Sequence, residues 1–312
     1  MEPDDLSTPS IQLITKAVLE KIVDESELFH CNDSSYATVS VGDHTETWLL
    51  TSREFRTWVS HQCYSREKVP LDLRAFKNFM PTLEGMARHE GREHEVHTRL
   101  AEHNGSIFLD LANAEWQVVE ITPTGWEVVS DCPVKFRRPK GMLALPTPER
   151  KGAIDELRPY VNVASEEDWV LVVAWLVAAL RPTGPYPVLA LYGEQGSAKS
   201  TTARVLRALV DPNRAPLRSE PPSPHELMIS AMNSWVTAYD NLSSLSKSLS
   251  NGLCRLATGG GIAVRELYTD TDEVILDAQR PVLLTSIPQI VTRPDLLDRS
   301  LPTELPAIPE GM

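Results

Sequence analysis

"LALYGEQGSAKSTTARVLRAL", residues 189–209, carries three structural signals in one short segment. Its apolar start predicts a strand over residues 188–192, and Gly193 and Gly196 predict a tight turn after that strand. The apolar spacing over residues 199–210 then predicts an amphipathic helix. A strand, a glycine-containing turn and a helix start are together typical of a phosphate-binding loop, because backbone N–H groups and the positive helix end attract phosphate.

The turn differs from the common loop pattern G-x-x-x-x-G-K-[ST] at one position, where Ala198 stands in place of glycine before Lys199. Lys199 is predicted to reach the β- and γ-phosphates of ATP, Ser200 to bind Mg²⁺ through its hydroxyl, and Thr201 to lie near the α-phosphate. Because alanine adopts a positive φ only at a cost, we expect right-handed helical torsions at Ala198. The alternative is a chance turn of small residues before a helix. The predicted nucleotide-binding residues are Gly193, Glu194, Gln195, Gly196, Ser197, Ala198, Lys199, Ser200 and Thr201.

The segments around the loop alternate between strand and helix patterns. A helix capped by Ser165 and apolar nearly all round over residues 169–180 is predicted to be buried. A poorly marked element lies near residues 215–219. Strand–helix alternation implies a parallel sheet with helices on both faces, an α/β fold of the P-loop NTPase type. Beyond the loop, helices are predicted over 225–232 and 245–257, and strands over 235–239 and 281–287.

The first half of the chain has a different pattern. Helices are predicted at 11–28, after Ser52 and at 71–90, with an interruption near Pro81, and short strands at 36–41 and 46–50. Residues 96–129 alternate apolar and polar side chains and predict a β meander. The proline-rich segment 133–152 predicts a connector, so we expect a smaller α+β domain over 1–150 and the P-loop domain over 151–312. Its "KFRRPK" is either a contact for a phosphate backbone or a solvated part of the connector.

Composition limits the class of protein. The chain has 312 residues and a net charge of −13, and residues 1–60 alone carry 4 basic and 11 acidic groups, so a broad basic surface for nucleic acid is not expected. Four separated cysteines without a CxxC pair argue against a zinc site, and "RHEGREHEVH" lacks a convincing metal-ligand spacing. No secretion signal or membrane-length apolar run is present, which predicts a soluble cytoplasmic protein.

Two further strand ends carry candidate catalytic residues. "SWVTAYDNL" places Asp240 after an apolar strand, where it would bind Mg²⁺ through water, and Asn241 next to it would orient a water. The alternative is a simple strand-ending turn. "RPVLLTSIP" ends a strand at Thr285-Ser286, and we expect Ser286 to hold the attacking water. Arg299 is predicted to act as an arginine finger on a neighbouring subunit, with a surface salt bridge as the alternative.

On these residues the region 188–306 resembles the AAA+ type ATPase core of superfamily 3 helicases and of phage or mobile-element primase-helicases. "GEQGSAKS" matches the G-x-x-G-x-A-K-S loop of minichromosome-maintenance replicative helicases, and "DLLDRS" is similar to their arginine-finger segment. The resemblance implies a homo-oligomer, a hexamer if the ATPase is active, and a pore hairpin between the Asp240 and Ser286 strands. Arg255 and Arg265 are the candidates there for contact with single-stranded DNA, although Asp270, Asp272 and Glu273 make the hairpin acidic.

The predicted function is therefore ATP binding with Mg²⁺ and hydrolysis coupled to translocation along single-stranded DNA, as in a DNA replication helicase. The alternative is a nucleotide-binding regulatory or interaction protein with little hydrolysis, which Asn241 favours. A small-molecule kinase would need a lid and an acceptor pocket that the sequence does not indicate. Because Met312 follows Arg299 by only about 13 residues, we expect an incomplete C-terminal lid, and so a fragment, a truncated gene or a degraded copy.

Overall fold

The computed structural model describes residues 10–265 and 273–309. The chain divides into two compact units, and each is described on its own. Unit 1 comprises residues 1–97 with 133–137, and unit 2 comprises residues 98–132 with 138–312.

Unit 1 is an antiparallel three-stranded sheet with helices packed on it. The strands β1 (Glu27–Cys31), β2 (Ser34–Val41) and β3 (His44–Leu49) follow one another in the sheet, joined by tight turns. Its core consists of apolar side chains from the helices and from the inward face of the strands, as alternation along β2 requires. The helices are α1 (Ile11–Glu25), α2 (Arg53–Glu67) and α3 (Leu73–His89), and the short strands β4 (Val96–His97) and β9 (Lys135–Phe136) pair in parallel.

Two predictions for unit 1 were wrong. The first helix ends at Glu25, and the residues that follow form β1. The helix α3 runs without interruption although Pro81 lies inside it. Proline removes one backbone donor but not the apolar face, and buried Phe76 and Leu83 on either side of Pro81 hold that face in the core.

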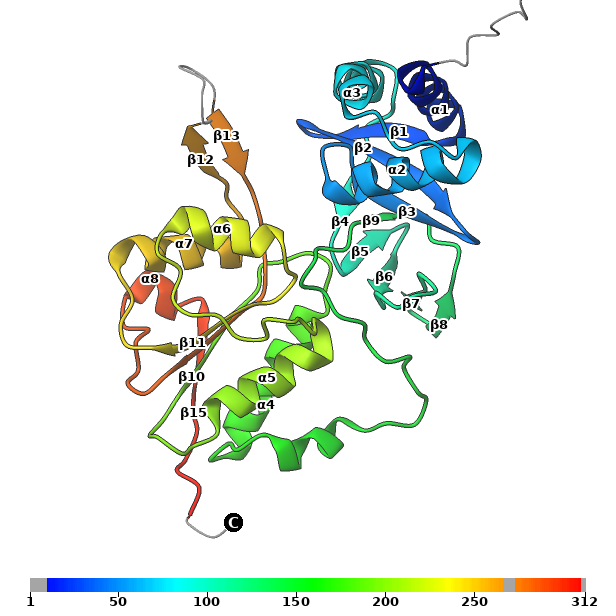
Figure 1. The fold of residues 1–312 in the computed structure, drawn as a ribbon. Helices are drawn as coiled ribbons and strands as arrows, with labels where there is room; N and C mark the ends of the chain where they lie inside the picture. The colour runs from blue at the N-terminus through cyan, green and yellow to red at the C-terminus, as the bar shows by residue number, and fades with distance from the viewer. Residues whose placement is uncertain (1–9, 266–272, 310–312) are drawn as a thin grey trace, which may run out of the picture. The chain divides into compact units, whose positions relative to one another are not determined.

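Unit 2 contains a parallel sheet, as predicted. Its strands lie in the order β11 (Thr237–Leu242), β14 (Val282–Ser286), β10 (Val188–Tyr192) and β15 (Ser300–Glu304), and every pair is parallel. Figure 1 labels β11, β10 and β15 of this sheet. Residue Arg218 adds a single parallel bridge to Tyr239 beyond β11, in the weak element predicted near 215–219. The helices are α4 (Glu166–Ala179), α5 (Lys199–Val210), α6 (Pro224–Met232), α7 (Lys247–Thr258) and α8 (Pro294–Leu297), with a 3₁₀ segment η1 (Ile154–Tyr160) before them.

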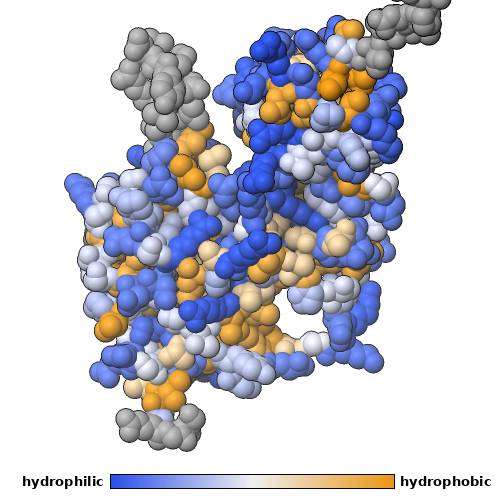
Figure 2. Space-filling view, viewed as in Figure 1, coloured by the Kyte–Doolittle hydropathy of each residue, from blue (hydrophilic) through white to orange (hydrophobic). Residues whose placement is uncertain are grey.

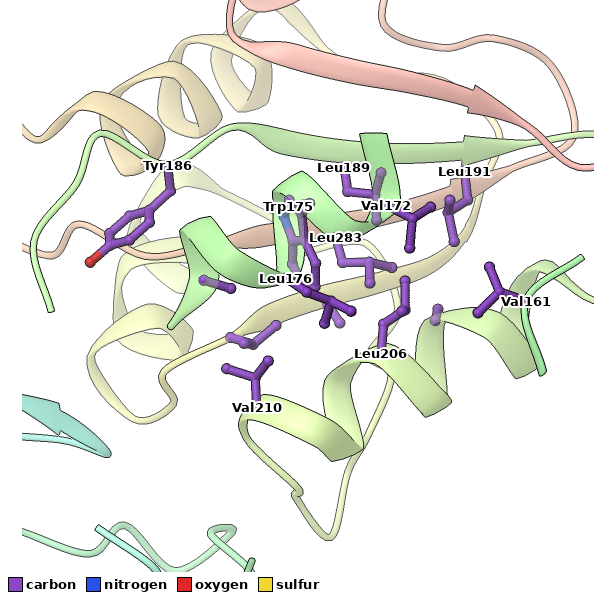
Figure 3. Close-up of a cluster of buried hydrophobic side chains, with 14 of the residues drawn as sticks. Val161, Val172, Trp175, Leu176, Tyr186, Leu189, Leu191, Leu206, Val210 and Leu283 are labelled. Atoms are coloured by element: carbon purple, nitrogen blue, oxygen red, sulfur yellow. The ribbon is translucent and has the colours of Figure 1, made fainter. Parts of the chain in front are cut away.

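Helices cover both faces of this sheet, because successive strand residues alternate between two apolar cores. Figure 3 shows Trp175 of α4 and Leu206 of α5 directed toward Leu189 and Leu283 of the sheet. The opposite face packs against α6, α7 and α8. The prediction that α4 is buried all round was wrong in part. Val170 and Val177 on its outer side are 56% and 61% exposed, because only the face toward the sheet is covered by described elements.

The meander belongs to the compact unit of the parallel sheet, so the structure divides the chain differently from the predicted boundary at residue 150. Arg99 explains the difference. Its fully buried guanidinium donates through Nε to Asp211 at the end of α5 (3.1 Å) and through Nη2 to the Leu143 carbonyl (2.8 Å). Leu100 joins the α4–α5 core. The strands are β5 (Leu100–His103), β6 (Ser106–Asp110), β7 (Val118–Thr122) and β8 (Gly125–Val129), all antiparallel.

The face drawn in Figure 2 is a mosaic in which hydrophobic residues lie between hydrophilic ones. Among the described residues, no helix combines the length and the apolar character that crossing a membrane requires.

Candidate functional site

A cavity of about 480 Å³ lies where β10, β11 and β14 reach their carboxyl ends, which in a parallel sheet meet at one edge. The loop that follows β10 forms most of its wall. The lining residues are Gln195, Gly196, Ser197, Ala198, Lys199, Ser200, Thr201, Asp240, Asn241, Thr285 and Ile287.

The two loop glycines are required by the backbone. Gly193 has φ 152°, and a Cβ there would lie 2.3 Å from the carbonyl oxygen of Leu305. Gly196 has φ 84°, which side chains disfavour. The side chain of Asn162, which the sequence analysis missed, donates to the carbonyls of Ser197 (3.1 Å) and Pro306 (2.7 Å) and so braces the loop. No sequence pattern around Asn162 pointed to this contact.

The backbone conformation of Ala198 differs from the prediction. It has φ 61° and ψ 21°, the left-handed conformation, where we had expected right-handed torsions. The residue stands at the N-cap of α5, and its carbonyl accepts the hydrogen bond from Thr202 N (2.9 Å) that begins the helix. Glycine would adopt this backbone conformation without steric strain. For alanine the same conformation carries a cost in free energy, because its Cβ approaches the following carbonyl oxygen.

Lys199 turns back onto its own loop. Its Nζ donates to the carbonyls of Gly193 (2.8 Å) and Glu194 (2.6 Å) and to Ser197 Oγ (3.1 Å). Partial burial lowers the pKa of the Lys199 ammonium group, and the negative charge of Asp240 acts in the opposite direction. An anion in the cavity would compete with the two carbonyls for these three donors.

Asp240 is the centre of a cluster of oxygen atoms. Its Oδ1 accepts hydrogen bonds from Ser200 Oγ (2.8 Å) and from Thr285 Oγ1. Carboxylate and hydroxyl oxygens are the ligands that Mg²⁺ prefers in proteins, so the residues present suit this metal. The start of α5, which follows the loop after β10, and two neighbouring strands thus contribute to one cluster.

Asn241 lies beside this cluster at an irregularity of β11. The strand register shifts between Tyr239 and Leu242, and Asn241 there has φ 56°. Its backbone N–H donates to Thr285 Oγ1 (2.9 Å). Asparagine adopts the left-handed conformation more readily than glutamate does, which gives a conformational reason for the residue at this position.

Ser286 does not line the cavity, and the structure instead brings Thr285 there. Ser286 is buried, and its hydroxyl donates to the carbonyl of Pro288 (2.7 Å). Successive residues of β14 point to opposite faces, and Leu283 packs on the α5 side of the sheet. Thr285 lies on the same face of β14 as Leu283 and therefore on the side of the loop helix α5, but the uniformly buried run 282–286 does not show this face in the sequence.

Arg299 lies at the opposite end of the sheet. It precedes β15, and its carbonyl accepts from the backbone of Val188, the first residue of β10, at 2.8 Å. The five residues of β10 at about 3.3 Å each separate it from the loop by roughly 15 Å, too far for its side chain to reach its own cavity. Its Nη1 donates to the Asp295 carbonyl, and Arg293 pairs with the Asp295 carboxylate (2.8 Å).

The predicted hairpin is present as the antiparallel pair β12 (Ile262–Arg265) and β13 (Glu273–Leu276). Arg265 ends β12, but its side chain, like Asp270 and Asp272, lies outside the described residues. Arg255 is an exposed residue of α7. No group of three potential metal-ligating His, Cys, Asp or Glu side chains occurs within residues 10–265 and 273–309.

The "KFRRPK" segment is tied into the fold at two points. Lys135 pairs with Glu27 at 2.5 Å, and Arg138 pairs with Asp110 at 2.6 Å. The Arg138 guanidinium also stacks 3.6 Å from the ring centre of Trp116. These two cations therefore have partners within the protein.

Comparison with known proteins gives one family. Residues 154–309, half of the chain, match the model described as "Actinomycete integrative conjugative element replication protein". A search of the curated proteins finds no match.

Two solved structures are similar at low identity. The chain aligns with the apo NrS-1 C terminal region at 10% identity and a TM-score of 0.47, covering 97% of this chain and 63% of that one. It aligns with "SCCmec type IV Cch - active helicase" at 14% identity and a TM-score of 0.43, covering 86% of this chain and 51% of that one. The chain therefore spans less than two thirds of the length of either.

Proposed function

The chain belongs to the family of actinomycete integrative conjugative element replication proteins, and from this premise we propose that it is an ATPase of the P-loop type that drives DNA replication. The observation that carries the proposal is the convergence of Lys199, Ser200 and Asp240 on one cavity. Two segments about 40 residues apart supply these groups: the start of α5 supplies the cation and the hydroxyl, and β11 supplies the carboxylate. These are the groups that a nucleoside triphosphate and its metal require.

The residues of the cavity would have distinct tasks. Ser200 and Asp240 would hold Mg²⁺, which supplies charge neutralisation at the β- and γ-phosphates. Lys199 would exchange its loop carbonyls for phosphate oxygens. Residues 199–201 at the start of α5 line the same cavity, so their backbone N–H groups would be available to phosphate. Thr285, which donates to Asp240, would fix the orientation of that carboxylate.

The position of Arg299 supports a site that is shared between two copies of the chain. Since Arg299 lies at the far end of β10 from its own loop, it could act only on the cavity of a neighbouring copy. Such a contact is heterologous and closes into a ring when the rotation between copies allows it. We propose a homo-oligomer, with a hexamer as the expected size.

Translocation along single-stranded DNA is the part of the proposal that the fewest described residues support. The β12–β13 hairpin and the exposed Arg255 are its candidates. Basic side chains on such a hairpin would contact phosphates, and DNA binding would then weaken with salt.

ATP turnover and ATP binding, measured separately for the wild type, test the proposal. Lys199→Ala is expected to abolish turnover and to weaken binding at least tenfold, whereas Lys247→Ala removes an exposed lysine outside the cavity and should leave both unchanged. Absence of binding in the wild type would refute the nucleotide site. Turnover that does not respond to single-stranded DNA would refute the motor and keep the ATPase.

A complementation assay tests the shared site. Lys199→Ala and Arg299→Ala should each be inactive alone. In an equal mixture, about one quarter of the interfaces would join an intact loop to an intact arginine, so activity should return to roughly that fraction. A strict monomer by mass measurement in ATP, or a mixture without activity, would exclude a role for Arg299 on a neighbouring copy.

The second candidate is a nucleotide-binding regulatory protein with little hydrolysis. Asn241 favours it, because an amide cannot act as a general base and the left-handed backbone at this position disfavours glutamate. Binding of ATP without turnover, in the presence and absence of DNA, would support it.

A further inference from the structure

A second cavity, of about 490 Å³, lies on the other side of β11 from the phosphate loop. It occupies the space beside the segment that extends the sheet by its single bridge at Arg218. Its volume is within the range of small-molecule sites. The lining residues are Ala215, Leu217, Arg218, Ser219, Glu220, Pro221, Pro222, Glu226, Ser230 and Tyr239.

One end of this cavity is rich in hydrogen-bond donors. The Arg218 Nη1 donates to Ser230 Oγ, which leaves the other guanidinium donors of this half-buried side chain available to a ligand. Tyr239 is 2% exposed, and burial raises the pKa of its hydroxyl while the neighbouring Ser230 hydroxyl acts in the opposite direction. Among the described residues, the Tyr239 hydroxyl makes no hydrogen bond of normal geometry. A buried hydroxyl in that position costs free energy unless something bonds to it.

A second buried guanidinium adds positive charge behind this end. Arg207 donates through Nη1 to the carbonyls of Ala215 (3.1 Å) and Pro216 (2.7 Å), and its Nη2 lies 3.9 Å from the Asp211 carboxylate. Burial lowers the pKa of Arg207 to about 10; the charge of Asp211 opposes the shift, and that of Arg218 adds to it. The donor-rich end is therefore built to receive an anion.

The rest of the cavity limits the size and charge of that anion. Leu217, Pro221 and Pro222 give it apolar walls. Glu220 and Glu226 are exposed at its edge, where they would repel a polyanion but accept hydrogen bonds from hydroxyl or amino groups.

We propose that this cavity binds a small phosphomonoester of nucleotide size, with its phosphate at Arg218 and Tyr239 and its organic part against the two prolines. The site is separate from the phosphate loop but coupled to it through the backbone. Arg218 donates to Ala238 (3.0 Å) and accepts from Asp240 N (2.9 Å), and Tyr239 directly precedes Asp240. A ligand that orders Arg218 and Tyr239 would also order the carboxylate of the first cavity.

Calorimetric titration with adenosine monophosphate, inorganic phosphate and a single-stranded oligonucleotide tests the proposal. The full chain with Lys199→Ala serves as background, because this substitution is expected to weaken binding at the loop at least tenfold. Adenosine monophosphate is expected to bind this protein more tightly than inorganic phosphate. Adding Arg218→Gln should weaken that binding at least tenfold, and Tyr239→Phe, which removes one hydroxyl, about three- to tenfold. Adding Arg214→Gln, which removes a nearby exposed arginine outside the cavity, should not.

Three outcomes would overturn the proposal. The first is no binding of adenosine monophosphate or phosphate to the Lys199→Ala protein. The second is an equal loss in Arg214→Gln, which would indicate general charge attraction. The third is loss of oligonucleotide binding in Arg218→Gln with binding of the mononucleotide unchanged, which would make the cavity a nucleic-acid contact. Tyr239→Phe keeps the shape of the side chain, so it remains informative if Arg218→Gln fails to fold.

Discussion

Replacing Ala198 by glycine is expected to stabilise the protein, which is unusual for a glycine substitution. Ala198 has φ 61° and begins α5, so its Cβ is held in the left-handed region. A left-handed conformation costs an L-residue roughly 1–2 kcal/mol, and glycine removes that cost. Glycine also increases the conformational entropy of the unfolded chain, which lowers the free energy of unfolding by about 0.4–1 kcal/mol. The net expected gain is about 0.5–1 kcal/mol.

A matched control lies in the same helix. Ala208 is exposed in the interior of α5 and carries ordinary helical torsions, so Ala208→Gly should cost about 1 kcal/mol. For a domain of 150–250 residues, 1 kcal/mol shifts the melting temperature by about 2–4 °C. Ala198→Gly should therefore melt about 1–4 °C above the wild type, and Ala208→Gly about 2–4 °C below it.

Thermal unfolding followed by circular dichroism, without nucleotide, measures both variants. Ala198→Val supplies a third point, because a branched side chain at positive φ should destabilise more than alanine. If Ala198→Gly destabilised the protein as much as Ala208→Gly, the backbone at residue 198 would be right-handed and the strain argued from φ 61° would not exist.

Three further predictions concern buried polar groups. Burial raises the pKa of Tyr186 from 10 to about 12, so the folded state holds the phenol proton more tightly than the unfolded state does. The free energy of unfolding should therefore fall by up to about 3 kcal/mol as the pH rises from about 10 to 12. Melting curves of Tyr186→Phe over that range should lose this part of the pH dependence. Thr285→Val keeps the shape of the side chain but removes its hydrogen bond to Asp240, and should lower stability by about 2 kcal/mol in denaturant titrations; an unchanged midpoint would contradict the contact. Arg99→Met leaves the buried Asp211 carboxylate without its main cation and should cost about 3–5 kcal/mol in the same measurement; a loss below about 1 kcal/mol would show that the pair does not tie the meander to the sheet.

The fold of the second half could be predicted because its signals are local. The strand 188–192 and the helix 199–210 match β10 and α5 residue for residue, since an apolar run, a glycine turn and a helical period leave few alternatives. The placement of the meander could not be predicted, because it depends on contacts such as Arg99 with Asp211, 112 residues apart. Neither residue belongs to a local pattern that names its partner.

The candidate site divides in the same way. Loop residues 195–201 and Asp240 follow from strand ends, and the structure brings them to one cavity, whereas Gly193 and Glu194 are not part of its lining. The choice between Thr285 and Ser286 depends on which face of β14 each residue occupies, and a run buried on both faces does not reveal that. The conformation of Ala198 could not be predicted from the sequence for another reason. The residue type gives the free-energy cost of a positive φ, but the surrounding contacts determine whether the folded protein adopts it.

The two left-handed residues at the cavity, Ala198 and Asn241, favour a preorganised site over a chance turn. Strained torsions persist only where the surrounding structure holds them, and both residues are held: the Ala198 carbonyl by the first hydrogen bond of α5, and the Asn241 N–H by Thr285. Thr285 also donates to Asp240, so the constraint on Asn241 and the orientation of the carboxylate share one hydroxyl. Seven other non-glycine residues in the described part of the chain also have positive φ, so the torsions alone do not mark a site. Ala198 and Asn241 differ from most of these in lining the cavity that contains the Asp240 carboxylate, where they would keep donors and oxygen ligands aligned before a ligand arrives.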